Sequence, residues 1–184
     1  YRLFVNGLLQ HEELDVESRS KRRIDEALAD TRQEPREINR TVAQVLNELT
    51  DNLVIVTDSS GEEFYQKGLA SLLESPEFRE FNRTFQLMQF FDQFDELFRA
   101  IERHFFQDVN DYRAVQIFIG RENPYHSIED ETMIQAKYQL PQRTTGFLTL
   151  IGPMRMDYQY NLGLVQYVAD QLNKRAYEQR NEPR

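Results

Sequence analysis

The fold is decided by one stretch of the chain, Gly146-Phe-Leu-Thr-Leu-Ile-Gly-Pro-Met-Arg-Met-Asp-Tyr158. Residues 146–151 are mostly apolar and predict a β-strand, which the turn signal Gly152-Pro153 ends. Asp157 then precedes a helical pattern, where its carboxylate can accept a backbone N–H of the first turn. The apolar face of that helix contains Leu162, Val165, Val168, Ala169 and Leu172. The stretch therefore predicts a strand, a tight turn and a capped C-terminal helix.

Arg155 lies in the same turn, and two interpretations of it are open. Near a helix N-terminus it could help to hold an anion. Alternatively, a local carboxylate pairs with it and fixes the turn, which is the arrangement that we expect.

Three further segments predict strands, namely residues 53–57, 114–119 and 133–140. The last of them alternates between apolar and polar side chains, so we expect it to be half-exposed. Short links between strands, together with long flanking helices, predict an α+β fold with a largely antiparallel sheet.

The first 52 residues are polar and are predicted to be helical. Pro35 suits the first turn of a helix whose apolar residues recur at three- and four-residue steps. A short helical stretch is expected around residues 65–73, and residues 177–184 are expected to fray. We divide the chain into an N-terminal helical segment that is a candidate for linking or dimerisation (1–52), a core (53–178) and a polar tail (179–184).

Nine of the 13 phenylalanines lie between residues 78 and 106. Ser75 can cap a helix there, with Pro76 in its first turn and Glu77 near its positive end. Asp92 could cap a second helix, so one kinked helix or two are expected. The residues at helical spacing are Phe78, Phe81, Phe85, Met88, Phe91, Phe94, Phe98, Ile101 and Phe105. We expect them to form one stripe facing the core, rather than the alternative, an aromatic box for a cofactor.

The charge balance argues against binding of nucleic acid or anionic lipid by this chain. It has 22 basic and 31 acidic residues, a net charge of −9, which repels phosphates. The basic cluster at residues 19–23 has acidic neighbours on both sides, so pairing within the helix explains it. No apolar run approaches the ~18 residues of a membrane span. The absence of cysteine agrees with a reducing cytoplasm, where we expect the chain to reside.

Catalytic and metal-binding patterns are not evident. His104 and Asp108 share a helical face, but two ligands do not make a metal site. The sequence has no Walker pattern, no G-x-G-x-x-G and no nucleophile elbow, and it has only three histidines. We therefore expect no enzyme activity, no catalytic residue, no cofactor and no metal.

The stretch quoted first resembles the C-terminal signature of the bacterial heat-inducible transcription repressor family HrcA. Its signature residues here are Gly152, Pro153, Arg155, Met156, Asp157 and Tyr158. A second landmark of that family, IG-x-EN, is matched by residues 119–123, with Gly120, Glu122 and Asn123. A third, LL-x-x-PEF, is matched by residues 72–78, with Pro76, Glu77 and Phe78. Residues 1–8 and 46–56 are similar to two further segments of the family, in the same order.

The resemblance implies a GAF-like fold, homodimerisation, and repression of chaperone genes at an inverted-repeat operator that heat relieves. It also implies a link to the GroE chaperonin. Operator DNA would be bound only through a winged-helix domain, which these residues do not include. Because the chain starts with Tyr, we expect that further sequence precedes it. Between residues 57 and 64 the chain also skips the family's inserted dimerisation segment, so it resembles a shortened or divergent member.

Three functions are compatible with these sequence features. The first is the regulatory, dimerising part of an HrcA-like repressor, without membrane contact. The second is a GAF-like sensor of a small molecule, with a pocket between the sheet and the Phe-rich helix. The third is a non-catalytic module that binds another protein. A pocket with convergent polar groups would favour the sensor, and a symmetric apolar interface would favour the repressor.

Overall fold

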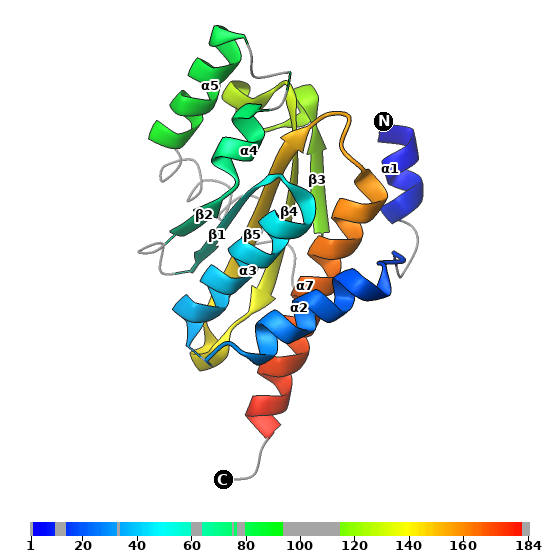
Figure 1. Ribbon diagram of the computed structural model, residues 1–184, viewed down its shortest axis with the longest axis vertical. Helices are drawn as coiled ribbons and strands as arrows, with labels where there is room; N and C mark the ends of the chain where they lie inside the picture. The colour runs from blue at the N-terminus through cyan, green and yellow to red at the C-terminus, as the bar shows by residue number, and fades with distance from the viewer. Residues whose placement is uncertain are drawn as a thin grey trace.

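β5 (Thr145–Pro153) lies at the centre of a five-stranded antiparallel sheet in the computed structural model of the chain (Figure 1). The structure describes residues 2–9, 14–32, 34–59, 64–74, 76, 80–93 and 115–181. The strands are ordered β2-β1-β5-β4-β3. The other strands are β1 (Leu53–Asp58), β2 (Phe64–Lys67), β3 (Val115–Ile119) and β4 (Glu131–Gln139). The predicted α+β class and antiparallel sheet are confirmed.

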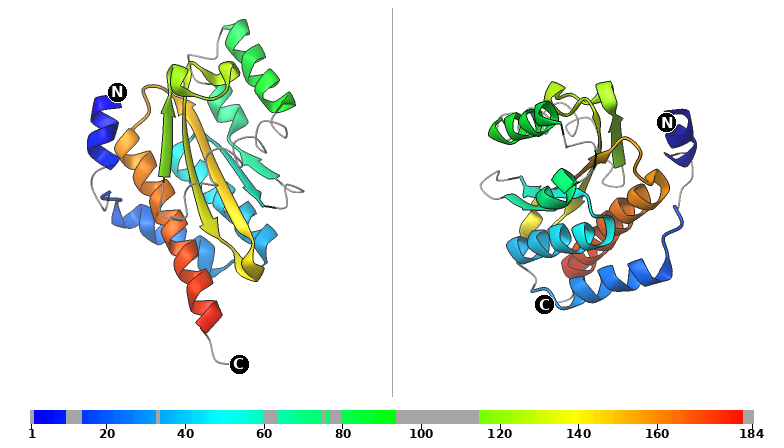
Figure 2. Two further views of the ribbon diagram at one scale, coloured as in Figure 1. Left: turned by 180° about the vertical axis from the view of Figure 1, so that it is seen from behind. Right: turned by 45° about the horizontal axis from the view of Figure 1, so that its top comes forward.

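Helices cover both faces of the sheet (Figures 1 and 2). One face packs against α2 (Ser18–Ala29), α3 (Pro35–Thr50) and α7 (Tyr158–Asn181), and the other against α4 (Leu69–Glu74) and α5 (Phe81–Asp92). A further helix, α1 (Arg2–Leu9), lies beside the start of α7 and the end of β3. Short 3₁₀ turns occur at residues 120–122, 126–128 and 141–143. None of the helices in the described ranges is both long and apolar enough to cross a membrane.

Two apolar clusters form the core, one on each face of the sheet. The larger cluster joins the sheet to the N-terminal helices through Ile24, Leu28, Val42 and Leu46, all of them fully buried. The smaller cluster packs Leu72, Leu87 and Phe90 against the opposite face. Residues 18–50 therefore share a core with the sheet.

The burial of β4 differs from our expectation of a half-exposed strand. β4 lies between β3 and β5, and all its residues except the last are buried. Polar side chains such as Thr132, Gln135 and Lys137 are therefore buried as well. Alternation between apolar and polar residues was misleading here because helices cover both faces.

Two other segments also differ from the prediction. Residues 65–73 were expected to be helical, but β2 occupies residues 64–67, and the helix α4 begins only at Leu69. The C-terminal helix continues through Asn181, beyond residue 177 where fraying was expected.

The Phe-rich stretch was predicted to start a helix at Pro76, but α5 starts at Phe81, and Pro76 itself is exposed. The predicted core-facing stripe is wrong for Phe81 and Phe85, whereas Phe91 packs against the smaller cluster. Phe81 is 79% exposed and Phe85 is 54% exposed, while Leu87 and Phe90 face inward. The stripe members Phe78, Phe94, Phe98, Ile101 and Phe105 lie outside the described residues, as do Ser75, Glu77, His104 and Asp108.

Tyr138 provides a test of the larger cluster. Its hydroxyl donates a hydrogen bond of 2.6 Å to Asn39 Oδ1, and both side chains are buried. Burial also raises the pKa of Tyr138, so the hydroxyl stays protonated. Tyr138→Phe leaves the Asn39 oxygen without this donor and is expected to lower the free energy of unfolding by about 1–2 kcal/mol. Urea denaturation of Tyr138→Phe, Asn39→Ala and the double variant measures the coupling. A strictly additive double variant would contradict this assignment.

Candidate functional site at one edge of the sheet

Three family landmarks of the sequence, in residues 46–56, 119–123 and 152–158, meet at one edge of the sheet. β3 and β5 end there, while β1 and β4 begin there, because neighbouring strands are antiparallel. The register pairs Thr132 with both Gly152 and Ile119, which brings residues 119–123 close to the turn at 152–158. We call this region, made of residues 120–123, 152–158, Asn47, Asn52 and Asn161, the signature edge.

Local hydrogen bonds form the signature turn. The Met156 N–H donates to the Pro153 carbonyl over 2.9 Å. The Tyr160 N–H donates to Asp157 Oδ1 over 3.0 Å, so Asp157 caps α7 as predicted. The buried Tyr158 hydroxyl donates to the Met154 carbonyl and lies 3.2 Å from Thr132 Oγ1 on β4. The turn is therefore attached both to the helix that follows it and to the sheet.

Three asparagines connect this turn to α3 and β1. The Asn52 amide donates to Asn161 Oδ1 over 3.1 Å, and the Asn161 amide donates to the Asp157 carbonyl over 2.7 Å. The Asn47 amide donates to the Asn52 carbonyl over 3.1 Å. Asn52 and Asn161 are both buried. The three asparagines were not predicted from the sequence, in which Asn161 was marked only as a polar residue beside the apolar face of its helix.

Two glycines leave room for Asn52. A Cβ at Gly152 would lie 2.3 Å from Asn52 Oδ1, which is too close for any side chain. Gly68 has a positive φ of 91°, and a Cβ there would lie 2.3 Å from the Asn52 carbonyl oxygen. The glycine of the signature is therefore needed because the Asn52 amide approaches the backbone of β5.

The loop at residues 120–123 is held by Asn123 and Glu122. The Asn123 amide lies 2.9 Å, 3.0 Å and 2.7 Å from the carbonyl oxygens of Gly120, Ile128 and Glu131. Glu122 Oε2 accepts the Ile119 N–H over 3.0 Å. Gly120 has a φ of 58°, and a Cβ there would lie 3.0 Å from Met154 Sδ in the signature turn. The two landmarks are therefore in close contact.

Arg2 of α1 reaches this loop. Its Nε donates to Glu122 Oε1 over 2.9 Å, and its Nη2 donates to Glu122 Oε2 and, over 3.0 Å, to the Ile117 carbonyl. The hydrogen bonds from Arg2 lower the pKa of the Glu122 carboxyl below its ordinary value. The pair is therefore ionised at neutral pH.

Three other predicted site residues lie in the same turn. Arg155 is exposed on the turn, and the carboxylate partner expected for it stays a prediction. Pro153 is half-buried and Met156 is buried. Within the described ranges, no three His, Asp or Glu side chains lie close enough to hold a metal ion.

The fold and this edge define a class of protein: an α+β domain in which distant sequence landmarks form one hydrogen-bonded edge of an antiparallel sheet. The chain belongs to the HrcA family, because the family profile described as the HrcA protein C terminal domain matches residues 6–161. That family comprises non-enzymatic regulators of transcription.

Several curated relatives carry the name heat-inducible transcription repressor HrcA. The protein from Halalkalibacterium halodurans is 27% identical over 145 residues, which cover 74% of this chain and 40% of the relative. The one from Syntrophobacter fumaroxidans is 26% identical over 171 residues, covering 89% and 48%. The one from Moorella thermoacetica is 29% identical over 136 residues, covering 74% and 37%. The chain thus spans less than half the length of these relatives.

One solved structure is similar in fold. It is a crystal structure at 2.2 Å resolution of a protein described only as hypothetical, with a TM-score of 0.63 and 12% sequence identity. The match covers 96% of this chain and 77% of the other. At that identity the similarity concerns the fold alone.

The cap of α7 gives a first prediction for this edge. Asp157→Ala removes the oxygen that accepts the Tyr160 N–H and is expected to lower the free energy of unfolding by about 1 kcal/mol. Gln159→Ala, at an exposed neighbouring position in the same turn, serves as the matched control and is expected to change it by less than about 0.5 kcal/mol. Chemical denaturation measures both. Equal effects of the two variants would show that the Asp157 carboxylate is not the cap.

The niche around Asn52 gives a second prediction. Gly152→Ala pushes the Asn52 amide away from Asn161 and is expected to lower the free energy of unfolding by about 2–3 kcal/mol. Gly7→Ala is the control, because no atom lies within 4 Å of a Cβ there. Alanine in that helix is expected to be neutral or to stabilise by up to about 1 kcal/mol. A Gly152→Ala variant as stable as wild type in thermal and urea unfolding would exclude a role for this close approach.

Proposed function

We propose that this chain is the regulatory and self-associating part of a repressor of heat-shock genes. In this proposal it holds two DNA-binding domains at the spacing of two operator half-sites and releases them on heating. Family membership supports the regulatory role, and the observation that carries the proposal is the convergence of the family landmarks on one hydrogen-bonded edge. The role is mechanical, since the symmetry of an operator matches the symmetry of the protein that binds it.

In this proposal the DNA contacts are made outside the chain. Its net charge is −9, and two of the four cationic residues in the basic cluster on α2 contact other parts of the chain. Arg23 forms an ion pair of 2.6 Å with Glu48, and the Lys21 ammonium lies 5.6 Å from the centre of the Tyr167 ring. These contacts support assigning operator binding to a separate domain.

For self-association, we propose the outer side of α5 in place of the N-terminal helices expected from the sequence. The apolar faces of α2 and α3 are already buried against the sheet. On α5, the rings of Phe81 and Phe85 stack with centroids 6.3 Å apart and are exposed, and Met88 follows them. Arg83 on the same helix is turned toward Asp130 and Glu131.

Charge favours a second copy as the partner of this surface. The exposed residues between Phe81 and Gln89 are uncharged, whereas the chain as a whole is strongly acidic. Two copies can therefore approach at α5 with little repulsion. A two-fold axis brings the same surface of both copies together, as in most homodimers. The α5 helix stands at the outer rim of the molecule in every view (Figures 1 and 2).

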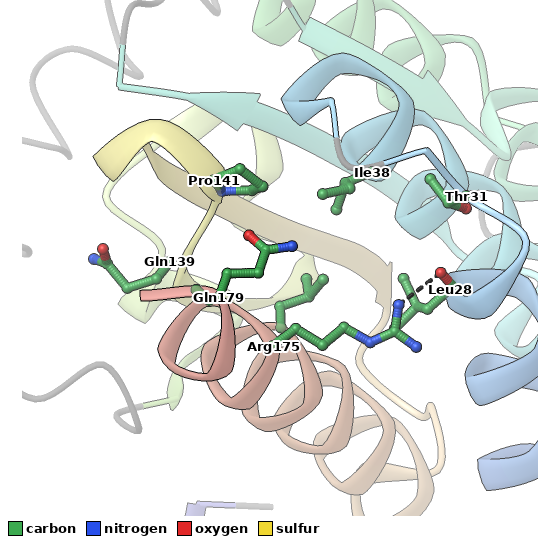
Figure 3. Close-up of a pocket in the computed structure, with 9 residues that line it drawn as sticks. Leu28, Thr31, Ile38, Gln139, Pro141, Arg175 and Gln179 are labelled. Atoms are coloured by element: carbon green, nitrogen blue, oxygen red, sulfur yellow. Dashed lines mark hydrogen bonds between the residues drawn. The ribbon is translucent and has the colours of Figure 1, made fainter. Parts of the chain in front are cut away.

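The pocket expected for a small-molecule sensor, between the sheet and the Phe-rich helix, would lie on the face of the sheet that packs against α5, where Gln86, Gln89 and Tyr125 line a groove. The cavity on the opposite face, between α2, α3, α7 and the end of β4, is too small to be such a pocket. It is lined by residues that include Leu28, Ile38, Gln139 and Arg175 (Figure 3). The Arg175 guanidinium extends along its wall and donates to the Leu28 carbonyl over 2.6 Å. The free volume is about 10 Å³, roughly the space for one water molecule. Ligand pockets are typically about 300–1,000 Å³.

A fusion protein tests the proposed function. The chain is joined to a DNA-binding domain that represses its own operator only when it is dimerised, and a reporter gene follows repression. We expect repression by the fusion, none by the chain alone, and loss of repression with Phe81→Ser combined with Phe85→Ser. Phe64→Ser, at an exposed phenylalanine on β2, is the matched control and should leave repression intact. Absence of repression, together with a monomer in sedimentation equilibrium at tens of micromolar, would refute the proposal.

A further inference from the structure

α1 is attached to the rest of the chain through few contacts. Among its described side chains, Val5 is fully buried and Leu8 is half-buried, whereas Leu3 is 91% exposed and Phe4 points outward as well. The remaining attachment is Arg2, whose guanidinium contacts Glu122 and the Ile117 carbonyl. Among the described side chains, α1 therefore docks through Val5, Leu8 and one arginine clamp.

The arginine clamp joins α1 to the signature edge. Glu122 accepts hydrogen bonds from both Arg2 and the Ile119 N–H, so the same carboxylate holds α1 and shapes the loop at residues 120–123. Gly120 of that loop contacts Met154 of the signature turn. The docking of α1 and the shape of the signature edge are therefore physically connected.

Helix α1 depends on this docking for its structure. An isolated helix shorter than about 12–15 residues is marginal in water, and α1 has eight residues. The Arg2–Glu122 pair is partly exposed, so solvent weakens it. In contrast, α7 has 24 residues, several of them fully buried in the larger cluster. We therefore expect α1 to detach at a lower free energy than α7.

We propose that α1 is a thermal latch, which leaves the signature edge and unfolds on warming while the sheet and its two clusters stay folded. The latch itself follows from the contacts above. Its biological consequence rests on the proposed function, in which a DNA-binding domain precedes α1. Opening of the latch then frees that domain from a fixed orientation before the core unfolds.

A spin label can report the latch, because the chain contains no cysteine. Leu3→Cys places a nitroxide on the exposed side of α1, and Gln159→Cys places one at an exposed position of α7. Electron paramagnetic resonance follows the mobility of each label with temperature, and circular dichroism follows global unfolding in the same samples. We expect the label on α1 to become mobile well below the temperature of the global transition. The label on α7 is expected to become mobile only at the global transition.

Matched variants identify the contacts that hold the latch. Arg2→Gln and Glu122→Gln are each expected to raise the detached population about two- to fivefold at a given temperature, the range for a partly exposed ion pair. Gly7→Ala, which favours the helical state of α1, is expected to lower it. Arg23→Gln removes an ion pair of the same kind between α2 and α3 and should leave the α1 transition unchanged.

Two results would overturn the latch. One is simultaneous release of both labels at the global transition, and the other is a fully mobile α1 label at low temperature in the wild-type background. These measurements involve no DNA and no self-association, so they are independent of the reporter assay. A normal latch in a chain whose fusion fails to repress would refute the proposed function and leave the latch supported.

Discussion

The Asn52 carboxamide donates to Asn161 while its oxygen lies against the backbone of Gly152, and the way that α3, the sheet and α7 meet depends on this contact. Asn52 lies where α3 ends and β1 begins, while Asn161 lies in the first turns of α7, more than a hundred residues later. A buried amide without a partner is costly, so the two asparagines fix how the N-terminal helices, the sheet and the C-terminal helix meet. Position 152 must therefore be glycine, because a side chain there would overlap the side-chain oxygen of Asn52.

This constraint explains why the family landmarks are distant in sequence but lie together in space. The signature turn receives hydrogen bonds from β4 and α7, and the loop at residues 120–123 packs against it through Gly120 and Met154. Arg2 extends the same edge to α1. A strongly connected edge beside a weakly docked helix is an arrangement in which warming can release one element without unfolding the rest.

The sequence predicted those parts of the fold that local patterns determine. The β-branched run of β1, the apolar run of β5 and the cap at Asp157 were all recognised, because each signal lies within a few residues. β2 was mistaken for helix, since its four residues form a partly exposed edge strand without a clear alternation. The outward direction of Phe81 and Phe85 was missed because residue spacing predicts an apolar stripe along the helix but not which side of the helix packs against the core. At the candidate site, Asn47, Asn52 and Asn161 could not be found, because their pairing depends on tertiary contacts.

Native-state hydrogen exchange at the backbone N–H groups of the signature edge tests directly whether this edge opens as one unit. The account predicts that the N–H groups of Met156, Tyr160, Ile119 and Asn123, all hydrogen-bonded here, open together with a free energy close to that of global unfolding. Exchange of these four groups at the rates of exposed loops, or with unrelated free energies, would contradict it.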